Sequence, residues 1–309
     1  MCNLTDPIYH DADKAREHLE ALRWPNGPVC PHCGSVDHAY ALKGKSTRPG
    51  VYKCADCRKP FSVTVGTVFE RSKVPLNKWI LAAHLMASSK KGFSAHQLHC
   101  TVGVTYKTAW FMMHRLREAM RDDSTDQMGG PGSSGIVEAD ETYIGNKKGA
   151  QKRAGVGHKM TVFSLVERGG KVRSAHISGK KVDGIKEGLK KHVSPEAHVV
   201  TDMYRAYNHV GRVFAKHSTV NHGANEWARG EAHTNTIEGF FSVFKRGMKG
   251  VYEHCREDHL HRYLAEFDFR YNHRAKLGVI DVERAQALLV AIGGKRLTDR
   301  RPIGPYLGQ

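Results

Sequence analysis

The chain has 309 residues, of which 40% are hydrophobic and 26% are charged, as is typical of a globular protein with two or three domains. This composition excludes a long disordered chain, and no apolar run reaches the roughly 18 residues of a membrane span. Because the N-terminus is polar and unlike a signal peptide, we expect a soluble, cytoplasmic protein.

The charge balance indicates a polyanionic partner. Lys and Arg number 48 against 31 Asp and Glu, which gives a net charge of +17. The excess is clustered, because Ile144 to Lys191 contains 13 basic and 3 acidic residues. Nucleic acid is the commonest partner of such a chain, and a solubility surplus spread over the surface is the alternative.

Four of the seven cysteines form two CxxC pairs, separated by twenty residues: Cys30, Cys33, Cys54 and Cys57. Structural Zn²⁺ takes four nitrogen or sulfur ligands in a tetrahedron, which two such pairs on hairpin tips supply. An odd number of cysteines fits a disulfide framework poorly. We therefore predict a zinc ribbon over residues 20–71 with a structural Zn²⁺, rather than four ordinary buried cysteines.

Residues 75–121 have the periodicity of three helices. The first starts at Pro75, the second near Ser94, and the third runs from Thr105 to Met120 after a turn that contains Gly103. This order predicts a helix-turn-helix-like DNA-binding segment, with an ordinary helical hairpin as the alternative. The polar face of the third helix offers four residues that can touch DNA: Tyr106, Lys107, His114 and Arg115.

A flexible linker is predicted over residues 122–135, which are rich in Gly, Ser and Asp. After it the pattern becomes α/β. The predicted elements are strands at 135–145, 161–168 and 171–177, a helix at 182–193, a strand at 198–202, and helices at 233–250 and 259–274. Residues 276–309 read as a weakly patterned tail.

Three acidic residues lie on three of these predicted elements. Asp140 lies in the first strand, Asp202 ends the strand HVVTD, and Glu238 lies on the later helix. Lys245 follows Glu238 by seven positions, two turns along the same helix face. Alone, each acid reads as a solvated charge or a cap. Together they predict a site for two divalent metals, which need several carboxylates from different elements.

The sequence resembles bacterial insertion-sequence transposases of the DDE superfamily, and most of all the ISXO-type group. The matching stretches span about residues 24–274: CPHCG, YKCADCRKPFSVTVGTVF, the helical unit, DETYIG, TDMYRAYN and HTNTIEGFFSVFKRG. The resemblance implies a multidomain protein with an N-terminal zinc ribbon, a helix-turn-helix-like segment and an α/β, RNase H-like DDE catalytic domain at residues 136–275. It also implies a cytoplasmic protein that is associated with the nucleoid when bound to DNA.

The resemblance places metal-binding carboxylates at Asp140 and Asp202, and a basic residue of the site at Lys245. The third ligand falls in HTNTIE, where members of the group carry either Asn or Glu. We favour Glu238, because its spacing from Asp202 and Lys245 matches the broader superfamily. Asn235 is then a supporting ligand or a DNA contact.

The implied activity is cleavage of the 3′ ends of an insertion sequence and their transfer to target DNA, with two Mg²⁺ or Mn²⁺ ions. The implied partners are double-stranded DNA and further copies of the chain in a homo-oligomer. Six basic residues are expected to contact DNA: Lys147, Lys148, Lys152, Arg153, Lys245 and Arg246. The alternatives are a zinc-dependent DNA-binding regulator that does not cut, and an RNase H-like nuclease without strand transfer.

Overall fold

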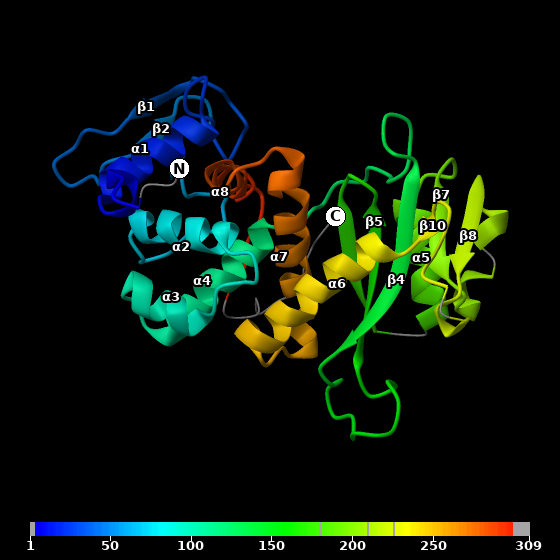
Figure 1. The fold of residues 1–309 in the computed structure, drawn as a ribbon. Helices are drawn as coiled ribbons and strands as arrows, with labels where there is room; N and C mark the ends of the chain where they lie inside the picture. Colours follow the sequence, from blue (N-terminus) through cyan, green and yellow to red (C-terminus); the bar gives the residue numbers. More distant parts are fainter. Residues whose placement is uncertain (1–3, 179–180, 209, 225, 299–309) are drawn as a thin grey trace. The chain divides into compact units, whose positions relative to one another are not determined.

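The computed structural model describes residues 4–178, 181–208, 210–224 and 226–298 (Figure 1). The chain divides into two compact units. Unit 1 contains residues 1–89, 93–120 and 280–309, and unit 2 contains residues 90–92 and 121–279. None of the described helices combines the length and the apolar character that crossing a membrane requires.

Unit 1 begins with the short 3-10 helix Pro7–Tyr9, the helix α1 (Ala12–Arg23) and a small antiparallel sheet. Its strands are β1 (Ala39–Ala41), β2 (Val51–Cys54) and β3 (Pro60–Ser62). The ring of Trp24 meets those of Tyr52 and Phe61 edge-on, with centroids 5.5 and 5.8 Å apart. Such a small apolar cluster stabilises this sheet only weakly. A bound metal would therefore supply much of the stability of the sheet.

Three helices follow, close to their predicted bounds: α2 (Leu76–Ser88), α3 (Ala95–Val102) and α4 (Tyr106–Ala119). Ser94 caps α3 through a reciprocal bond with Gln97. Gly103 ends α3 with a φ of 65°, which a glycine adopts at little cost. Thr105 then caps α4. The three helices pack on one another in the predicted helix-turn-helix-like order.

The C-terminal segment contains a helix, which corrects the expectation of a weakly patterned tail. Residues Asp281–Val290 form α8, which packs against α2 in unit 1. Leu288 and Leu289 are buried, and Arg284 donates a hydrogen bond of 3.1 Å to the carbonyl oxygen of Ala87. At ten residues α8 is too short to show a convincing helical period in the sequence.

Unit 2 is built on a five-stranded sheet with the strand order β6-β5-β4-β7-β8. The strands are β4 (Ile136–Ile144), β5 (Met160–Glu167), β6 (Val172–Ile177), β7 (His198–Asp202) and β8 (Lys216–Val220). The first three form an antiparallel meander, whereas β7 and β8 are parallel to β4. This topology confirms the predicted α/β, RNase H-like arrangement.

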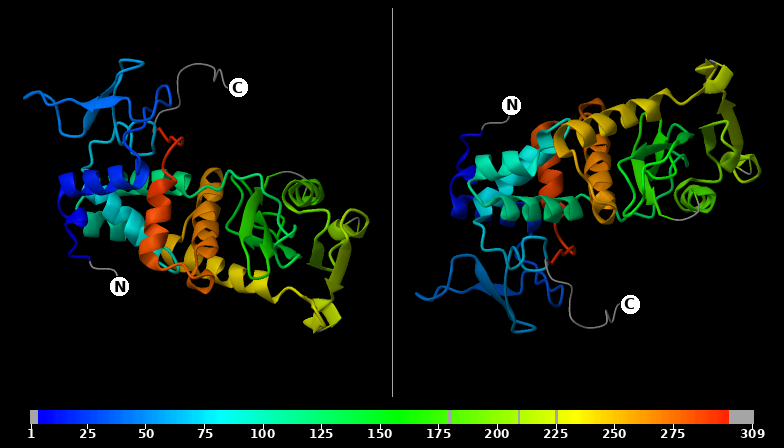
Figure 2. Two further views of the ribbon diagram at one scale, coloured as in Figure 1. Left: turned by 90° about the horizontal axis from the view of Figure 1, so that it is seen from above. Right: turned by 90° about the horizontal axis from the view of Figure 1, so that it is seen from below.

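Helices cover both faces of this sheet (Figures 1 and 2). The helix α5 (Lys181–His192) packs on one face, while α6 (Asn235–Gly247) and α7 (Leu260–Asn272) pack on the other. The short strands β9 (Ala228–Arg229) and β10 (Ala232–His233) precede α6, and the π-helix Met248–Tyr252 continues it. Successive residues of a strand point to opposite faces, so Val137 and Ala139 face α5, whereas Glu138 and Asp140 face α6.

Part of the segment 122–135 is docked on unit 2, which corrects the prediction of a wholly flexible linker. Met128 is buried in the core beneath α5. Its N–H donates to the carbonyl oxygen of His192 at 2.8 Å, and its own carbonyl accepts from the N–H of Ser194 at 2.9 Å. Glu167 accepts a hydrogen bond from the N–H of Gly129, and Arg173 donates to Ser124 and Asp126, so one apolar residue and several polar contacts together anchor the segment.

Candidate functional site

The four predicted zinc ligands come together in the small sheet of unit 1. The sulfurs of Cys30, Cys33, Cys54 and Cys57 all lie within 4.8 Å of one another. Two of the Sγ–Sγ distances, Cys30–Cys57 and Cys33–Cys54, are 3.6 and 3.7 Å. Tetrahedral zinc with Zn–S bonds of about 2.3 Å separates its sulfurs by about 3.8 Å, so this set fits Zn²⁺.

The backbone around the first pair favours a thiolate. Burial opposes ionisation of the Cys30 thiol, but the N–H groups of His32 and Cys33 bond to its sulfur, and its pKa falls to about 7. The thiolate is the form that binds metal. The imidazole of His32 is exposed and lies 3.4 Å from the carbonyl oxygen of Pro60, so it is not one of the four clustered groups.

The two predicted aspartates lie side by side on neighbouring strands of unit 2. The strands β4 and β7 are parallel, and Glu138 is opposite Val200 in their register. Asp140 and Asp202 each come two residues later, at the carboxyl end of the paired region. They therefore lie on the same face of the sheet, on strands spaced about 4.8 Å apart. This is the face that α6 covers.

The third acid comes from the first turn of α6. Glu238 is half-buried, accepts a hydrogen bond of 2.9 Å from the hydroxyl of Thr234, and acts electrostatically on Asp140. Asn235, one turn earlier, is exposed to solvent. Of the two residues, Glu238 is therefore the one that carries a charge close enough to act on Asp140.

Negative charge is concentrated around Asp140. Burial, with the charges of Asp202, Glu141 and Glu238, raises its pKa to about 7, although a hydrogen bond of 2.7 Å from the N–H of Glu141 opposes this rise. Among the described residues, neither Asp140 nor Asp202 has a cationic side chain within ion-pair distance. A divalent cation is the natural partner for such a group. The carboxylates are less tightly clustered than the cysteines, which form the one described group with all ligand atoms within 4.8 Å.

A functional residue that the sequence analysis missed is Glu138, two positions before Asp140. Its side chain is fully buried and accepts hydrogen bonds of 2.9 Å from the N–H groups of Thr236 and Ile237. The guanidinium of Arg168 lies 2.7 Å from the same carboxylate. Glu138 therefore caps α6 from the neighbouring strand and fixes the turn that carries Glu238. In the sequence, Glu138 can be recognised as an acidic residue between apolar neighbours at the start of the strand, in IVEA.

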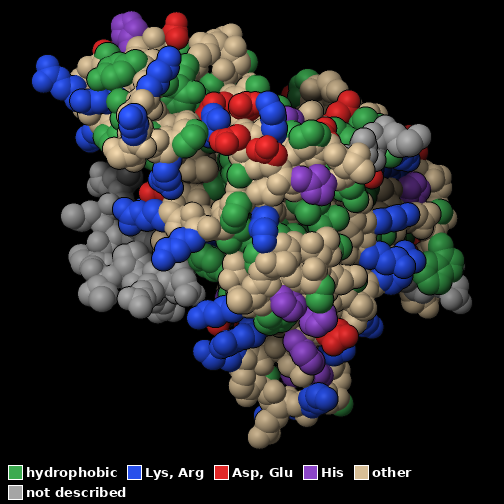
Figure 3. Space-filling model, turned by 90° about the vertical axis from the view of Figure 1, so that its left-hand side faces the viewer, with side chains coloured by type: hydrophobic (Ala, Val, Ile, Leu, Met, Phe, Trp, Pro, Cys, Tyr) green, Lys and Arg blue, Asp and Glu red, His purple; other side chains and the backbone are tan. Residues whose placement is uncertain are grey.

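Most of the basic residues predicted to contact DNA lie in two places. Lys147, Lys148, Lys152 and Arg153 belong to the loop between β4 and β5, and the last three of them are exposed. Lys245 and Arg246 lie in the last turn of α6. Lys and Arg side chains are also spread over the face seen in Figure 3, where the largest acidic group lies near the upper part. The positive surface is therefore not confined to the predicted loop.

The structure corrects two of the DNA contacts predicted on α4. Tyr106 and Lys107 are exposed, as expected. His114 is fully buried against the ring of Trp110, and Arg115 is buried and donates to the carbonyl oxygen of Glu70 at 3.1 Å. Segments distant in sequence cover this part of the helix, so only its first turn can reach DNA.

Comparisons with known proteins agree with this geometry. The profile of a family described as ISXO2-like transposase domain matches residues 133–272, and that of a transposase zinc-ribbon domain matches residues 10–60. A protein of the transposable element ISH50 from Halobacterium salinarum, itself uncharacterised, is 30% identical over 277 residues, or 83% of this chain and 90% of that protein. The chain belongs to the ISXO2-like transposase family. The predicted resemblance is thereby confirmed.

The matched ranges of this ISXO2-like transposase contain both candidate sites. The transposase domain runs from just before β4 to the last residue of α7, and so includes Asp140, Asp202 and Glu238. The zinc-ribbon domain includes all four clustered cysteines. The helices α2, α3 and α4 lie between the two matched ranges.

Removal of the metal is expected to unfold the ribbon and leave unit 2 folded. A strong chelator should open residues 24–69 to protease while residues 121–279 stay resistant, because the four thiolates replace a core that the small sheet lacks. Cys54→Ser should have the same effect without chelator, and His32→Ala should not. Limited proteolysis and circular dichroism of the full chain measure this, and an unchanged, metal-free ribbon would refute the site.

Glu138→Gln should weaken both the fold and the site. Loss of the charge facing Arg168 is expected to cost about 3 kcal/mol of unfolding free energy, measured by urea titration. The matched control is Glu266→Gln, on α7, where the guanidinium of Arg270 pairs with a carboxylate that is likewise fully buried. Both changes should destabilise, but only Glu138→Gln should reduce Mg²⁺-dependent DNA cleavage at temperatures where both proteins are folded. Equal cleavage by both would show that Glu138 does not position α6.

Proposed function

We propose that this chain is the transposase of an insertion sequence, which binds the ends of its element, cleaves their 3′ ends and joins them to target DNA. The proposal is carried by one observation: Asp140 and Asp202 share a face of the sheet, and Glu238, on the helix that covers this face, acts electrostatically on Asp140. Membership of the transposase family supports it.

Carboxylates are the ligands that Mg²⁺ and Mn²⁺ prefer, and the uncompensated charge at Asp140 fits such a cation. Asp140, Asp202 and Glu238 would hold the ions, and Asn235 would add a neutral oxygen or contact DNA. When bound, two such ions supply charge that activates the attacking oxygen and stabilises the leaving oxygen.

The reaction consists of two in-line displacements at phosphorus. In the first, a water oxygen bonds to the phosphorus while the bond to the 3′ oxygen breaks, which frees a 3′-OH at the element end. In the second, this 3′-OH attacks a phosphodiester of the target and displaces one of its oxygens. No covalent bond to the protein forms, so neither a serine nor a tyrosine nucleophile is required.

Basic residues hold the DNA in this proposal. Lys148, Lys152 and Arg153 in the β4–β5 loop neutralise phosphates, so binding falls steeply with salt. Tyr106 and Lys107 lie in the first turn of α4, the part of a recognition helix that contacts base edges. Two element ends cut together require at least two copies of the chain.

Asp140→Asn and Asp202→Asn should each abolish Mg²⁺-dependent cleavage. Each change removes a metal ligand and with it several kcal/mol of charge stabilisation in the transition state. The cleavage rate should therefore fall about a thousandfold. DNA affinity should be unchanged or higher, because each change removes a negative charge that faces phosphate. Cleavage of labelled element-end DNA and a binding titration measure both effects. Retained cleavage in either folded variant would exclude that aspartate from the metal site.

The same assay separates the other two functions. Nicked ends that never join a target would indicate a nuclease on this fold. Specific binding without any cleavage by the native chain, in Mg²⁺ or Mn²⁺, would indicate a regulator.

The third ligand is tested by comparing Glu238→Gln with Asn235→Ala in one Mg²⁺ titration. A carboxylate holds a divalent metal by charge, whereas an amide offers only a neutral oxygen. Because Glu238 faces Asp140 and Asn235 is exposed, Glu238→Gln should remain inactive at high Mg²⁺ and Asn235→Ala should only be slower. The reverse order would assign the ligand to Asn235, and equally mild effects would remove α6 from the metal site.

A further inference from the structure

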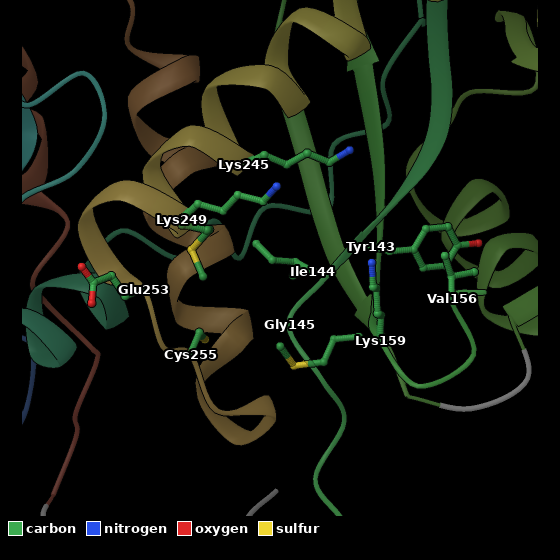
Figure 4. A pocket seen from close by; sticks show the side chains of 11 residues that line it. Tyr143, Ile144, Gly145, Val156, Lys159, Lys245, Lys249, Glu253 and Cys255 are labelled. Carbon is green, nitrogen blue, oxygen red and sulfur yellow. The ribbon is translucent and has the colours of Figure 1, made fainter. Parts of the chain in front are cut away.

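A pocket of about 490 Å³ lies between α6 and the adjoining strands of unit 2 (Figure 4). It is lined by the end of β4, the start of β5, the last turn of α6 and the π-helix that follows. Six of its lining residues matter here: Ile144, Lys159, Met160, Lys245, Met248 and Lys249.

The pocket lies close to the proposed metal site along two elements. Ile144 follows Asp140 by four residues on β4, a distance of about 13 Å at 3.3 Å per residue. Lys245 follows Glu238 by seven residues on α6, about 10 Å at 1.5 Å per residue. DNA whose phosphodiester would be held by cations at the proposed metal site would therefore place a neighbouring nucleotide at the pocket.

The rim of the pocket is positively charged. Lys245 and Lys249 extend from the helical wall toward the strands, and Lys159 lies across from them (Figure 4). Glu253 is the one acidic residue of the lining, and no carboxylate of the described chain lies within ion-pair distance of the three lysines. Three uncompensated ammonium groups around one hollow suit an anion, and phosphate is the anion that this protein would handle.

The floor of the pocket is apolar. Ile144, Met160 and Met248 contribute to the lining, and all three belong to the core beneath α6. Phosphates alone need no such surface, since they bind lysines on an open face. A ligand that uses both parts carries a negative charge and a flat apolar group, as a nucleotide does. Methionine side chains adapt readily to such a group.

The helical wall has an unusual shape at this point. After Gly247 the chain forms one wide π-helical turn, Met248–Tyr252, and then turns back at Glu253 with a φ of 53°. Glu253 and Cys255 thereby return to line the pocket. π-Helical turns inside α-helices occur frequently at functional sites, and this one contributes Met248 and Lys249 to the pocket wall.

We propose that this pocket receives a single unstacked nucleotide of the element end, next to the cleaved bond. Its phosphates lie on Lys159, Lys245 and Lys249, and its base packs against Ile144, Met160 and Met248. The inference rests on the proposed function and goes beyond it by naming the place where a base of the element-end DNA is unstacked. Unstacking one base costs a few kcal/mol, which burial of the base and the lysine contacts offset.

The test uses the full chain with Ca²⁺ in place of Mg²⁺, so that DNA binds without being cut. The probes are duplexes from the DNA that flanks the coding region, with 2-aminopurine replacing each of the three bases beside the cleaved bond in turn. This base fluoresces more strongly when it is unstacked. One position should brighten about twofold or more on binding, and the others should not.

Three variants locate the unstacked base. Lys159→Ala and Lys249→Ala should each reduce the salt dependence of binding by about one in log–log slope. Val156→Glu, at a pocket-lining side chain that is 43% exposed, adds a negative charge without disturbing the core. All three should lose the fluorescence rise. Lys276→Ala, an exposed lysine of unit 2 outside the pocket, is the control and should keep both signals.

The outcomes decide the proposal separately from catalysis. A lower salt slope without brightening at any position would show backbone contacts only and would overturn it. Brightening that persists in all three variants would place the unstacked base elsewhere. Brightening in a native chain that never cleaves would support the pocket while refuting the proposed activity.

Discussion

The buried carboxylate of Glu138 joins the central strand to α6, and the geometry of the site follows from that bond. Removing a charge from water costs several kcal/mol, so a buried acid persists only with strong partners. Glu138 has them in the first N–H groups of α6 and in Arg168. The N-terminus of a helix carries partial positive charge, which adds to the attraction. The first turn of α6 therefore has one preferred position on β4, and Glu238 is held with it.

Glu138 and Asp140 lie two residues apart on β4, but their carboxylates have different roles. Glu138 faces donors on every side, so its charge is compensated within the fold. Asp140 faces Asp202, Glu141 and Glu238, and burial with this crowding raises its pKa to about 7. One carboxylate thus stabilises the fold, whereas the other leaves negative charge that an external cation must balance. In the absence of a metal, the carboxylates around Asp140 repel one another. Such repulsion is expected at a site that binds metal tightly.

Much of the site could be predicted because its parts lie on strongly patterned elements. Apolar runs identified β4 and β7, and parallel strand ends meet at one edge, so Asp140 and Asp202 could be paired from sequence alone. Contacts between residues that are far apart in the sequence could not be predicted in this way. His114 and Arg115 are polar residues on a helix and were predicted to be exposed, but they are buried. Glu138 was overlooked because an acid in a strand looks the same whether solvent or a helix N-terminus faces it.

A single rigid element connects the proposed metal site to the pocket. Glu238 lies in the first turn of α6, Lys245 in its last, and Lys249 in the π-helix beyond. With its N-terminus fixed by Glu138, α6 sets the spacing between them at 1.5 Å per residue. Sites on helices and strands are held more precisely than sites on loops. The opposite wall, with Val156 and Lys159, ends the glycine-containing β4–β5 loop. One wall would therefore fix the position of the nucleotide, while the other adapts to the DNA that enters.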